Sequence, residues 1–184
     1  MPALRCESAA PPSPTRRAFL KRCAASLLAW QELGRRAGAN ELRVGAPAPV
    51  ATLVTLEGQT LRSSDFAGQV VVLTFFATWC PPCRGELPLL GRFAARHAAD
   101  GLRVLGFSLD GAESLAEVRR LAQSLPFPVG LLSRSDVSGY GRIWRLPVNF
   151  TIDRSGRLRN DGWREHQPAW TAERLEQIVL PLLG

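Results

Sequence analysis

One stretch of the sequence constrains the fold more than any other. The apolar run VVVLTFF, residues 70–76, is followed by ATWCPPC and then by a further proline at position 88. β-Branched and aromatic residues without polar alternation are typical of a strand that is buried on both faces. Proline is tolerated in the first turn of a helix, because the N–H that it lacks has no intrahelical partner there. The stretch therefore predicts a buried strand that ends before Cys80, and a helix that begins near Pro81 and kinks at Pro88.

Strands and helices alternate along the rest of the chain. Residues 102–109 and 127–132 have the composition of buried strands, and residues 114–124 place apolar side chains on one helical face. This alternation predicts an α/β fold in which helices flank a central mixed β-sheet. The other expected elements are a hairpin of residues 50–55 and 60–62, a short helix near residues 137–144, a second hairpin of residues 148–152 and 158–163, and a last helix from residue 171 to about residue 183.

The first 39 residues differ in charge from the rest. The net charge of the chain is +7, of which +5 lies in residues 1–39 and +2 in residues 40–184, so no nucleic-acid surface is expected. The segment TRRAFLK begins at Thr15 and is followed by an apolar stretch, residues 23–30, and by an A-x-A pattern at residues 37–39. This order resembles a twin-arginine export signal. We therefore expect an export signal followed by one domain, and a periplasmic location in a bacterium. Membrane association is expected only if the signal stays uncleaved.

Removal of the signal would leave two cysteines, Cys80 and Cys83. A structural disulfide stabilises a protein by closing a long loop, and this pair closes almost none. A structural zinc site needs four ligands, whereas the domain offers this pair and two scattered histidines, His97 and His166. A c-type haem requires histidine directly after the second cysteine, where Arg84 stands. We therefore expect no metal and no cofactor, only a redox-active disulfide between the two cysteines.

The predicted strand–helix junction gives the two cysteines different roles. Cys80 falls at the helix cap, where unpaired backbone N–H groups and the helix dipole stabilise a thiolate, so it is the expected nucleophile. Cys83 lies one turn further on and is expected to be more buried. It would attack the mixed disulfide and release the reduced substrate. Pro81 and Pro82 stiffen the loop between them and remove two backbone donors.

WCPPC after a buried strand, the helix proline and the later segment LPVNFTIDRSG resemble the thioredoxin-like superfamily, and more narrowly its exported TlpA/ResA branch of thiol–disulfide oxidoreductases. The resemblance covers about residues 42–183. It implies a thioredoxin-like fold with an N-terminal hairpin and a strand–helix insertion at residues 114–144. It also implies that Pro147 is a cis-proline and that the backbone of Leu146 pairs with a substrate peptide. The expected substrate-binding residues are Trp79, Pro81, Pro82, Leu146 and Pro147.

The resemblance also points to Glu86, three residues after Cys83, as a carboxyl near the active site. Classical thioredoxins instead bury an aspartate on the preceding strand, at the position of Thr74 here, so that acid is absent. Two interpretations of Glu86 stay open. It is either a partly buried carboxyl with a raised pKa that exchanges a proton with Cys83, or a solvated carboxylate that the helix dipole favours.

Three functions fit these features. The first is an exported reductase of client-protein disulfides that receives electrons from a membrane thiol carrier; the resemblance implies cytochrome c maturation or copper-site assembly as its setting. The second is an oxidase or isomerase for secreted proteins, which differs from the first in the potentials of its partners. The third is a Cu(I)-binding thiol protein, since soft thiolates suit copper. It is disfavoured, because the sequence offers two ligands and no Met-rich or His-rich stretch.

Overall fold

The computed structural model describes residues 42–184, and the export signal expected in residues 1–39 lies outside them. The described residues form a five-stranded mixed sheet and a separate two-stranded hairpin. The three strands on one side of the large sheet are parallel, and the last two are antiparallel to their neighbours, which confirms the predicted mixed sheet. In spatial order the strands are β5 (Val129–Leu131), β4 (Leu102–Ser108), β3 (Val70–Phe76), β6 (Val148–Ile152) and β7 (Leu158–Asp161).

β3 lies at the centre of the sheet because its side chains are apolar on both faces. Each of its seven residues is buried, as the sequence predicted. Alternate side chains of a strand point to opposite faces, so β3 contributes to two cores. Val72 and Phe76 enter one core, and Leu73 and Phe75 enter the other. β3 therefore ends at a fixed point between two packed layers, and the active-site loop begins there.

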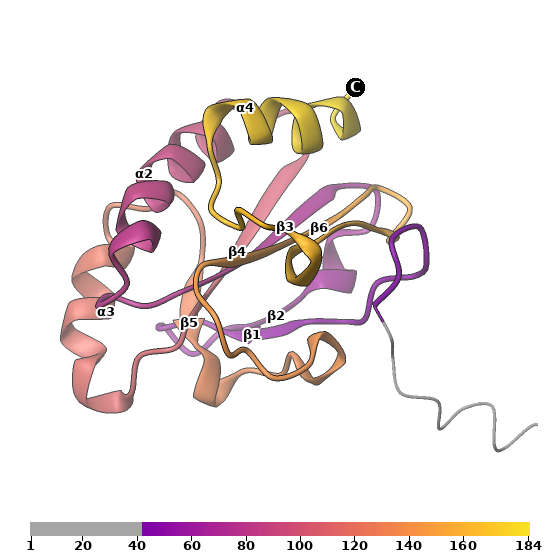
Figure 1. Ribbon diagram of the computed structural model, residues 1–184. Helices are drawn as coiled ribbons and strands as arrows, with labels where there is room; N and C mark the ends of the chain where they lie inside the picture. The colour runs from indigo at the N-terminus through magenta and orange to yellow at the C-terminus, as the bar shows by residue number, and fades with distance from the viewer. Residues whose placement is uncertain (1–41) are drawn as a thin grey trace, which may run out of the picture. The chain divides into compact units, whose positions relative to one another are not determined.

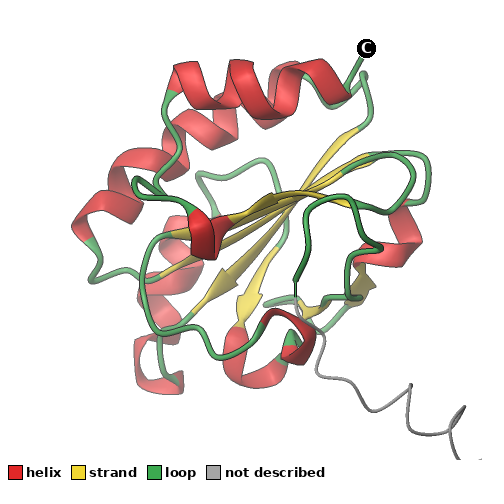
Figure 2. Cartoon of the chain, turned by 45° about the vertical axis from the view of Figure 1, so that its right-hand side comes forward, coloured by secondary structure: helices red, strands yellow, loops and turns green. Residues whose placement is uncertain are grey.

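The α-helices cover one face of this sheet, and the hairpin and short 3-10 turns pack on the other. Figure 1 shows α2 (Pro81–Arg96) and the C-terminal helical segment together above the sheet, and Figure 2 shows helices on both sides of the strands. Leu87 and Leu90 of α2 enter the first core. The hairpin strands, β1 (Thr52–Val54) and β2 (Thr60–Arg62), bring Leu53 into the second core. Among the described residues, no helix has the length and apolar character needed to cross a membrane.

The last helix departs from the continuous helix that the sequence predicts. Thr171 caps it as expected, because its Oγ1 accepts a hydrogen bond of 3.2 Å from the backbone N–H of Arg174. The segment then runs as α4 (Ala172–Arg174), a π-helix (Leu175–Val179) and a 3-10 helix (Leu180–Leu182). Pro181 accounts for the change near the end, since a proline has no N–H to donate to the preceding turn.

Three other predicted elements are shorter than expected. The helix expected near residues 137–144 is a single 3-10 turn, Ser138–Tyr140. Gly141 follows it with a φ of 77°, a left-handed conformation that glycine adopts easily and that ends the turn. The helix expected at residues 114–124 is α3 (Leu115–Ala122), preceded by a 3-10 turn, Ala112–Ser114. β7 ends at Asp161, where a further 3-10 turn begins.

Candidate active site

The antiparallel pairing of β3 with β6 brings two loops to the same edge of the sheet. Phe75 pairs with Val148, so the residues that follow β3 lie beside the residues that precede β6. The first loop carries Cys80. The second carries the Leu146–Pro147 peptide bond, which is cis, as the resemblance implied. Leu146 packs against the core cluster that contains both cysteines.

Cys80 and Cys83 form a disulfide, with their Cα atoms 5.3 Å apart. Cys80 is the N-cap of α2, and its Sγ accepts a hydrogen bond of 3.3 Å from the backbone N–H of Cys83. Cys80 is 4% exposed and Cys83 is fully buried, which agrees with the predicted difference between them. Pro81 and Pro82 occupy the exposed first turn of the helix, where neither offers an N–H to the sulfur.

Glu86 is buried, which excludes the interpretation of this residue as a solvated carboxylate. Its side chain is on α2, and the residue is 2% exposed. The Oε2 atom accepts a hydrogen bond of 2.6 Å from the backbone N–H of Trp170, and the Nδ2 of Asn149 lies 3.4 Å from each carboxylate oxygen. Burial raises the pKa of Glu86 to about 7, although these hydrogen bonds and the charge of Arg174 oppose the shift. A carboxyl with this pKa exchanges protons readily near neutral pH.

The polar groups around Glu86 come from strands and from a distant loop. Thr74 of β3 pairs with Asn149 of β6, and both side chains are buried beneath the helix. Thr74 lies near enough to Glu86 to favour its charged form slightly, but its hydroxyl makes no hydrogen bond within 3.5 Å to any described residue. Asn149 also donates to the carbonyl of Pro168, at 2.9 Å. Sequence reasoning did not identify Asn149 or Trp170, since neither belongs to the local pattern around the cysteines.

A second buried carboxylate, also not identified from the sequence, contacts the loop before Cys80. Asp110 is 3% exposed and accepts hydrogen bonds from the backbone N–H and the hydroxyl of Thr78. The signal that could have found it is positional. Asp110 follows the buried strand β4, and the carboxyl ends of parallel neighbouring strands lie at the same edge of a sheet.

Two exposed tryptophans border the site. Trp79, beside Cys80, is 67% exposed, so it lines the site from the outside instead of packing beneath it. Trp144, in the loop before Pro147, is 70% exposed. Its ring stacks on that of Trp163, with centroids 5.6 Å apart, and the guanidinium of Arg145 lies within 5.8 Å of both ring centroids. Large exposed aromatic side chains beside a cation are typical of protein-binding surfaces.

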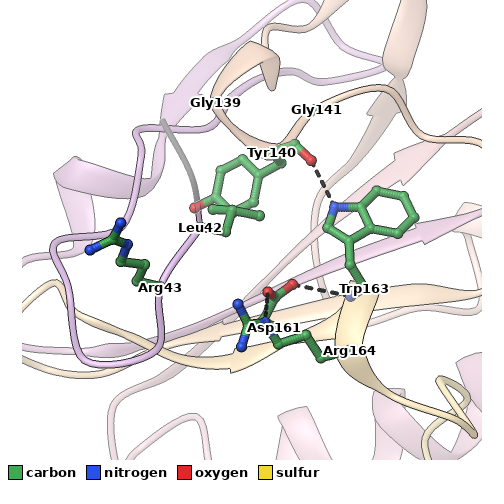
Figure 3. Close-up of a pocket in the computed structure, with 8 residues that line it drawn as sticks. All are labelled: Leu42, Arg43, Gly139, Tyr140, Gly141, Asp161, Trp163 and Arg164. Atoms are coloured by element: carbon green, nitrogen blue, oxygen red, sulfur yellow. Dashed lines mark hydrogen bonds and ion pairs between the residues drawn. The ribbon is translucent and has the colours of Figure 1, made fainter. Parts of the chain in front are cut away.

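A cavity of about 400 Å³ lies behind Trp163 (Figure 3), and neither cysteine lines it. The indole Nε1 of Trp163 donates to the carbonyl of Tyr140 at 2.8 Å. The carboxylate of Asp161 accepts the backbone N–H of Trp163 at 3.1 Å and pairs with the guanidinium of Arg164 at 3.3 Å. Trp163 is thus held in place from this side, and its other contacts support the ring of Trp144.

The two histidines stay outside the site. The ring of His97 packs at a tilt against that of Phe93 at the end of α2 and pairs with Asp100 at 2.8 Å, and His166 is exposed. Within residues 42–184, no group of three or more His, Cys, Asp or Glu side chains is placed to hold a metal ion.

A disulfide at the start of a helix, at the same edge of a mixed sheet as a cis-proline loop, defines the class of thiol–disulfide oxidoreductases with a thioredoxin-like fold. Residues 44–160 match the model of the AhpC/TSA family, and the chain belongs to this family.

Curated and solved relatives support the same class. The chain is 28% identical to thiol-disulfide oxidoreductase ResA of Bacillus thuringiensis subsp. konkukian over 141 residues, which are 76% of this chain and 78% of the relative. It is 31% identical to ResA of Oceanobacillus iheyensis over 138 residues, 73% and 70% of the two chains. A Chlorobium tepidum structure described as a thiol:disulfide interchange protein DsbE is 31% identical, with a TM-score of 0.65 over 78% of this chain and all of that one. The predicted fold and enzyme class are confirmed.

Proposed function

We propose that this oxidoreductase works as a reductase of client-protein disulfides outside the cytoplasm. Cys80 attacks a client disulfide, and Cys83 resolves the mixed disulfide, so the client leaves reduced and the enzyme is left in the disulfide form seen here. A membrane thiol carrier then restores the dithiol. Cytochrome c maturation and copper-site assembly are the settings that fit clients whose cysteines must stay reduced.

The observation that best supports a reductase is the small number of hydrogen-bond donors near the Cys80 sulfur. Within the described residues, one hydrogen-bond donor, the backbone N–H of Cys83, contacts this sulfur. The prolines at positions 81 and 82 remove the two other N–H groups of the helix start. A strongly oxidising enzyme has a reduced form that its surroundings stabilise. Here the helix dipole and the Cys83 N–H stabilise the Cys80 thiolate, but the two prolines withhold the further N–H groups that a helix start otherwise offers. The stabilisation is therefore smaller than at a helix start with all its donors, which favours a couple that gives electrons away.

Glu86 supplies the proton exchange that the buried cysteine requires. The Cys83 thiol is fully buried, and burial in an apolar site disfavours its thiolate. Glu86 follows three residues later on the same helix, so both side chains lie on one helical face. With its pKa near 7, the Glu86 carboxylate accepts the Cys83 proton when the mixed disulfide is resolved and returns it in the reverse step.

The client-binding surface consists of Trp79, Leu146, Pro147 and the stacked ring of Trp144. An extended client segment pairs with the backbone of Leu146, and the two exposed indoles contact the side chains that flank its cysteine. Arg145 is fixed beside them, because its Nη2 donates to the carbonyls of Gly162 and Glu165. This cation favours a client segment that carries apolar and acidic side chains near its cysteine.

The N-terminal sequence supports export of the protein from the cytoplasm through a twin-arginine signal. A reporter that is exported only when already folded, fused after residue 39, tests this directly. The wild-type segment is expected to carry the reporter out of the cytoplasm, and the Arg16→Lys, Arg17→Lys double substitution is expected to block it. Equal export of the two fusions would contradict a twin-arginine signal.

The redox state of the enzyme in growing cells tests the reducing direction. Cells are quenched with acid, and free thiols are labelled with a maleimide that changes electrophoretic mobility. A reductase is expected to hold most of the Cys80–Cys83 pair as the dithiol. A pool that is almost entirely disulfide would instead support an oxidase of secreted proteins.

A further inference from the structure

Asp110 forms the densest set of short hydrogen bonds near the active-site loop. Its Oδ2 accepts the backbone N–H of Thr78 at 2.9 Å and the hydroxyl of Ser108 at 2.5 Å, and its Oδ1 accepts the hydroxyl of Thr78 at 2.6 Å. The backbone N–H of Asp110 returns a bond of 3.2 Å to Ser108 Oγ. With the residue only 3% exposed, these contacts take place largely out of water, where each is worth more than at the surface.

The place of Asp110 in the sheet explains why it contacts this loop. β3 and β4 are parallel neighbours, and Phe76 pairs with Ser108 at their carboxyl ends. The backbone N–H of Leu109 donates to the carbonyl of Phe76 at 2.8 Å, which continues the pairing by one more residue. Asp110 therefore faces Thr78, two residues before Cys80. The Thr78 hydroxyl also lies 3.4 Å from Glu117 Oε2 of α3, the helix in the segment inserted after β4.

We propose that Asp110 is a positioning residue for thiol–disulfide exchange. Its carboxylate fixes both the backbone and the side chain of Thr78, and this contact holds Cys80 at the N-cap of α2, within reach of Cys83. Asp110 does not touch the sulfur atoms in the exchange. It acts through Thr78, and it links the catalytic loop to the strand that precedes the insertion.

The step that depends on the contact between Asp110 and Thr78 is closure of the intramolecular disulfide. The Cys83 thiolate attacks Cys80 Sγ in the mixed disulfide; the Cys80–Cys83 bond forms, the bond to the client breaks, and the client sulfur leaves as a thiolate that takes up a proton. The rate and equilibrium of closure depend on how closely the loop holds the two sulfurs together. A loop released from Asp110 samples more conformations, so the effective concentration of one thiol at the other falls.

Two substitutions in the full-length protein test the contact between Asp110 and Thr78, one at each residue. Asp110→Asn removes one carboxylate oxygen as an acceptor, and Thr78→Val removes the hydroxyl. Each is expected to lower the equilibrium constant for disulfide formation against glutathione by about tenfold, the factor of one hydrogen bond to a charged group. The double variant is expected to be no worse than the more severe single variant, because both act on the same contact. Thr78→Ser keeps the hydroxyl and is expected to restore the value to within about threefold.

This design separates positioning from the electric field of the carboxylate. A field effect on the sulfurs would appear in Asp110→Asn and leave Thr78→Val unchanged, and that result would overturn the proposal. If both variants lost thermal stability and kept the wild-type redox equilibrium, Asp110 would be purely structural and the proposal would also fail. If Asp110→Asn does not fold, the comparison of Thr78→Val with Thr78→Ser decides the question alone.

Asp153 provides a matched control in the same sheet. Its Oδ1 accepts three hydrogen bonds within the β6–β7 turn, from the backbone N–H of Ser155 at 2.9 Å, the hydroxyl of Ser155 at 2.7 Å and the backbone N–H of Arg157 at 3.0 Å. The turn joins the end of β6 to β7, whereas the catalytic loops adjoin the start of β6. Asp153→Asn is therefore expected to lower stability and to leave the glutathione equilibrium of the cysteines unchanged.

Discussion

Two carboxyl groups lie within the same protein at almost the same burial, yet their surroundings differ. Glu86 is 2% exposed and Asp110 is 3% exposed. Asp110 accepts three hydrogen bonds of 2.9 Å or less, two of them from the single residue Thr78. Glu86 accepts one short bond, from the Trp170 backbone, and has two longer contacts of 3.4 Å with Asn149.

The difference shows that burial alone does not determine what a carboxyl group does. Glu86 accepts few short hydrogen bonds, so the desolvation of its carboxylate outweighs them. Desolvation raises the pKa of Glu86 to about 7, which suits proton exchange. Where one loop residue, Thr78, supplies two short donors, the carboxylate of Asp110 fixes that loop in place. The protein thus combines a carboxyl whose pKa suits proton exchange with one whose hydrogen bonds suit positioning, and both follow the cysteine pair in the sequence.

Substitution of either cysteine is expected to affect activity more than substitution of either carboxyl. Cys80→Ser is expected to abolish reduction of a peptide disulfide, because no thiolate remains to attack it. Cys83→Ser is expected to keep the first attack and to accumulate mixed disulfides, which non-reducing electrophoresis and mass spectrometry detect. Full turnover by Cys83→Ser would contradict the dithiol mechanism.

Glu86→Gln tests whether the carboxyl of Glu86 exchanges a proton with Cys83. The amide preserves the size of the side chain and keeps an acceptor for the Trp170 N–H, but it exchanges no proton. Resolution of the mixed disulfide is expected to slow by about 100-fold, at the lower end of the contribution of a general base. Stopped-flow measurements across pH 5–9, about two units on either side of 7, give the pH–rate profile of this step. The wild-type profile is expected to have an inflection near pH 7, and the Glu86→Gln profile is expected to lack it. An unchanged pH–rate profile would remove Glu86 from the mechanism.

Burial of Glu86 also predicts how stability depends on pH. The folded pKa of about 7 exceeds the ordinary value of 4.5, so between these pH values the folded protein binds the proton more tightly than the unfolded chain does. The contribution of Glu86 to the free energy of unfolding therefore falls as pH rises through this window, by about 3 kcal/mol, and is constant above it. Denaturant unfolding of the wild type and Glu86→Gln at pH 4.5 and at pH 8 measures the difference. Parallel pH profiles for the two proteins would contradict the raised pKa.

The smallest expected effect concerns the exposed aromatic surface, which involves neither carboxyl. Trp144→Ala is expected to raise the KM for a peptide disulfide with flanking apolar and acidic residues by about fivefold, the equivalent of about 1 kcal/mol. Leu180→Ala is a control, since Leu180 is also exposed but belongs to the C-terminal segment. Equal KM values for Trp144→Ala and the control would exclude Trp144 from client binding.

The strand–helix core of the site was predictable because its signals are local. The apolar run at residues 70–76 and the prolines after Cys80 fixed the end of the strand and the start of α2, and the structure confirms both. The burial of Glu86 was not predictable, because its contacts lie 63 and 84 residues away, at Asn149 and Trp170. Sequence position alone left a buried and a solvated Glu86 equally open.

Other differences arise where backbone chemistry overrides a periodic pattern. The apolar spacing after Thr171 predicted one continuous helix, yet Pro181 lacks the N–H that such a helix requires. The left-handed Gly141 limits the helix expected near residues 137–144 to a single turn. The role of Asp110 was missed because its hydrogen bonds cross from one parallel strand end to the next, and such pairing depends on sheet order.

The reduction potential of the Cys80–Cys83 couple tests the central claim most directly. The purified full-length protein is equilibrated with defined thiol–disulfide buffers, and the fraction of dithiol is measured after rapid alkylation. Within residues 42–184, one backbone donor contacts the Cys80 sulfur, and this predicts a potential near or below about −220 mV, in the range of glutaredoxins and thioredoxin. A potential near about −120 mV, that of a strong oxidant, would contradict a reductase and assign the protein to the insertion of disulfides.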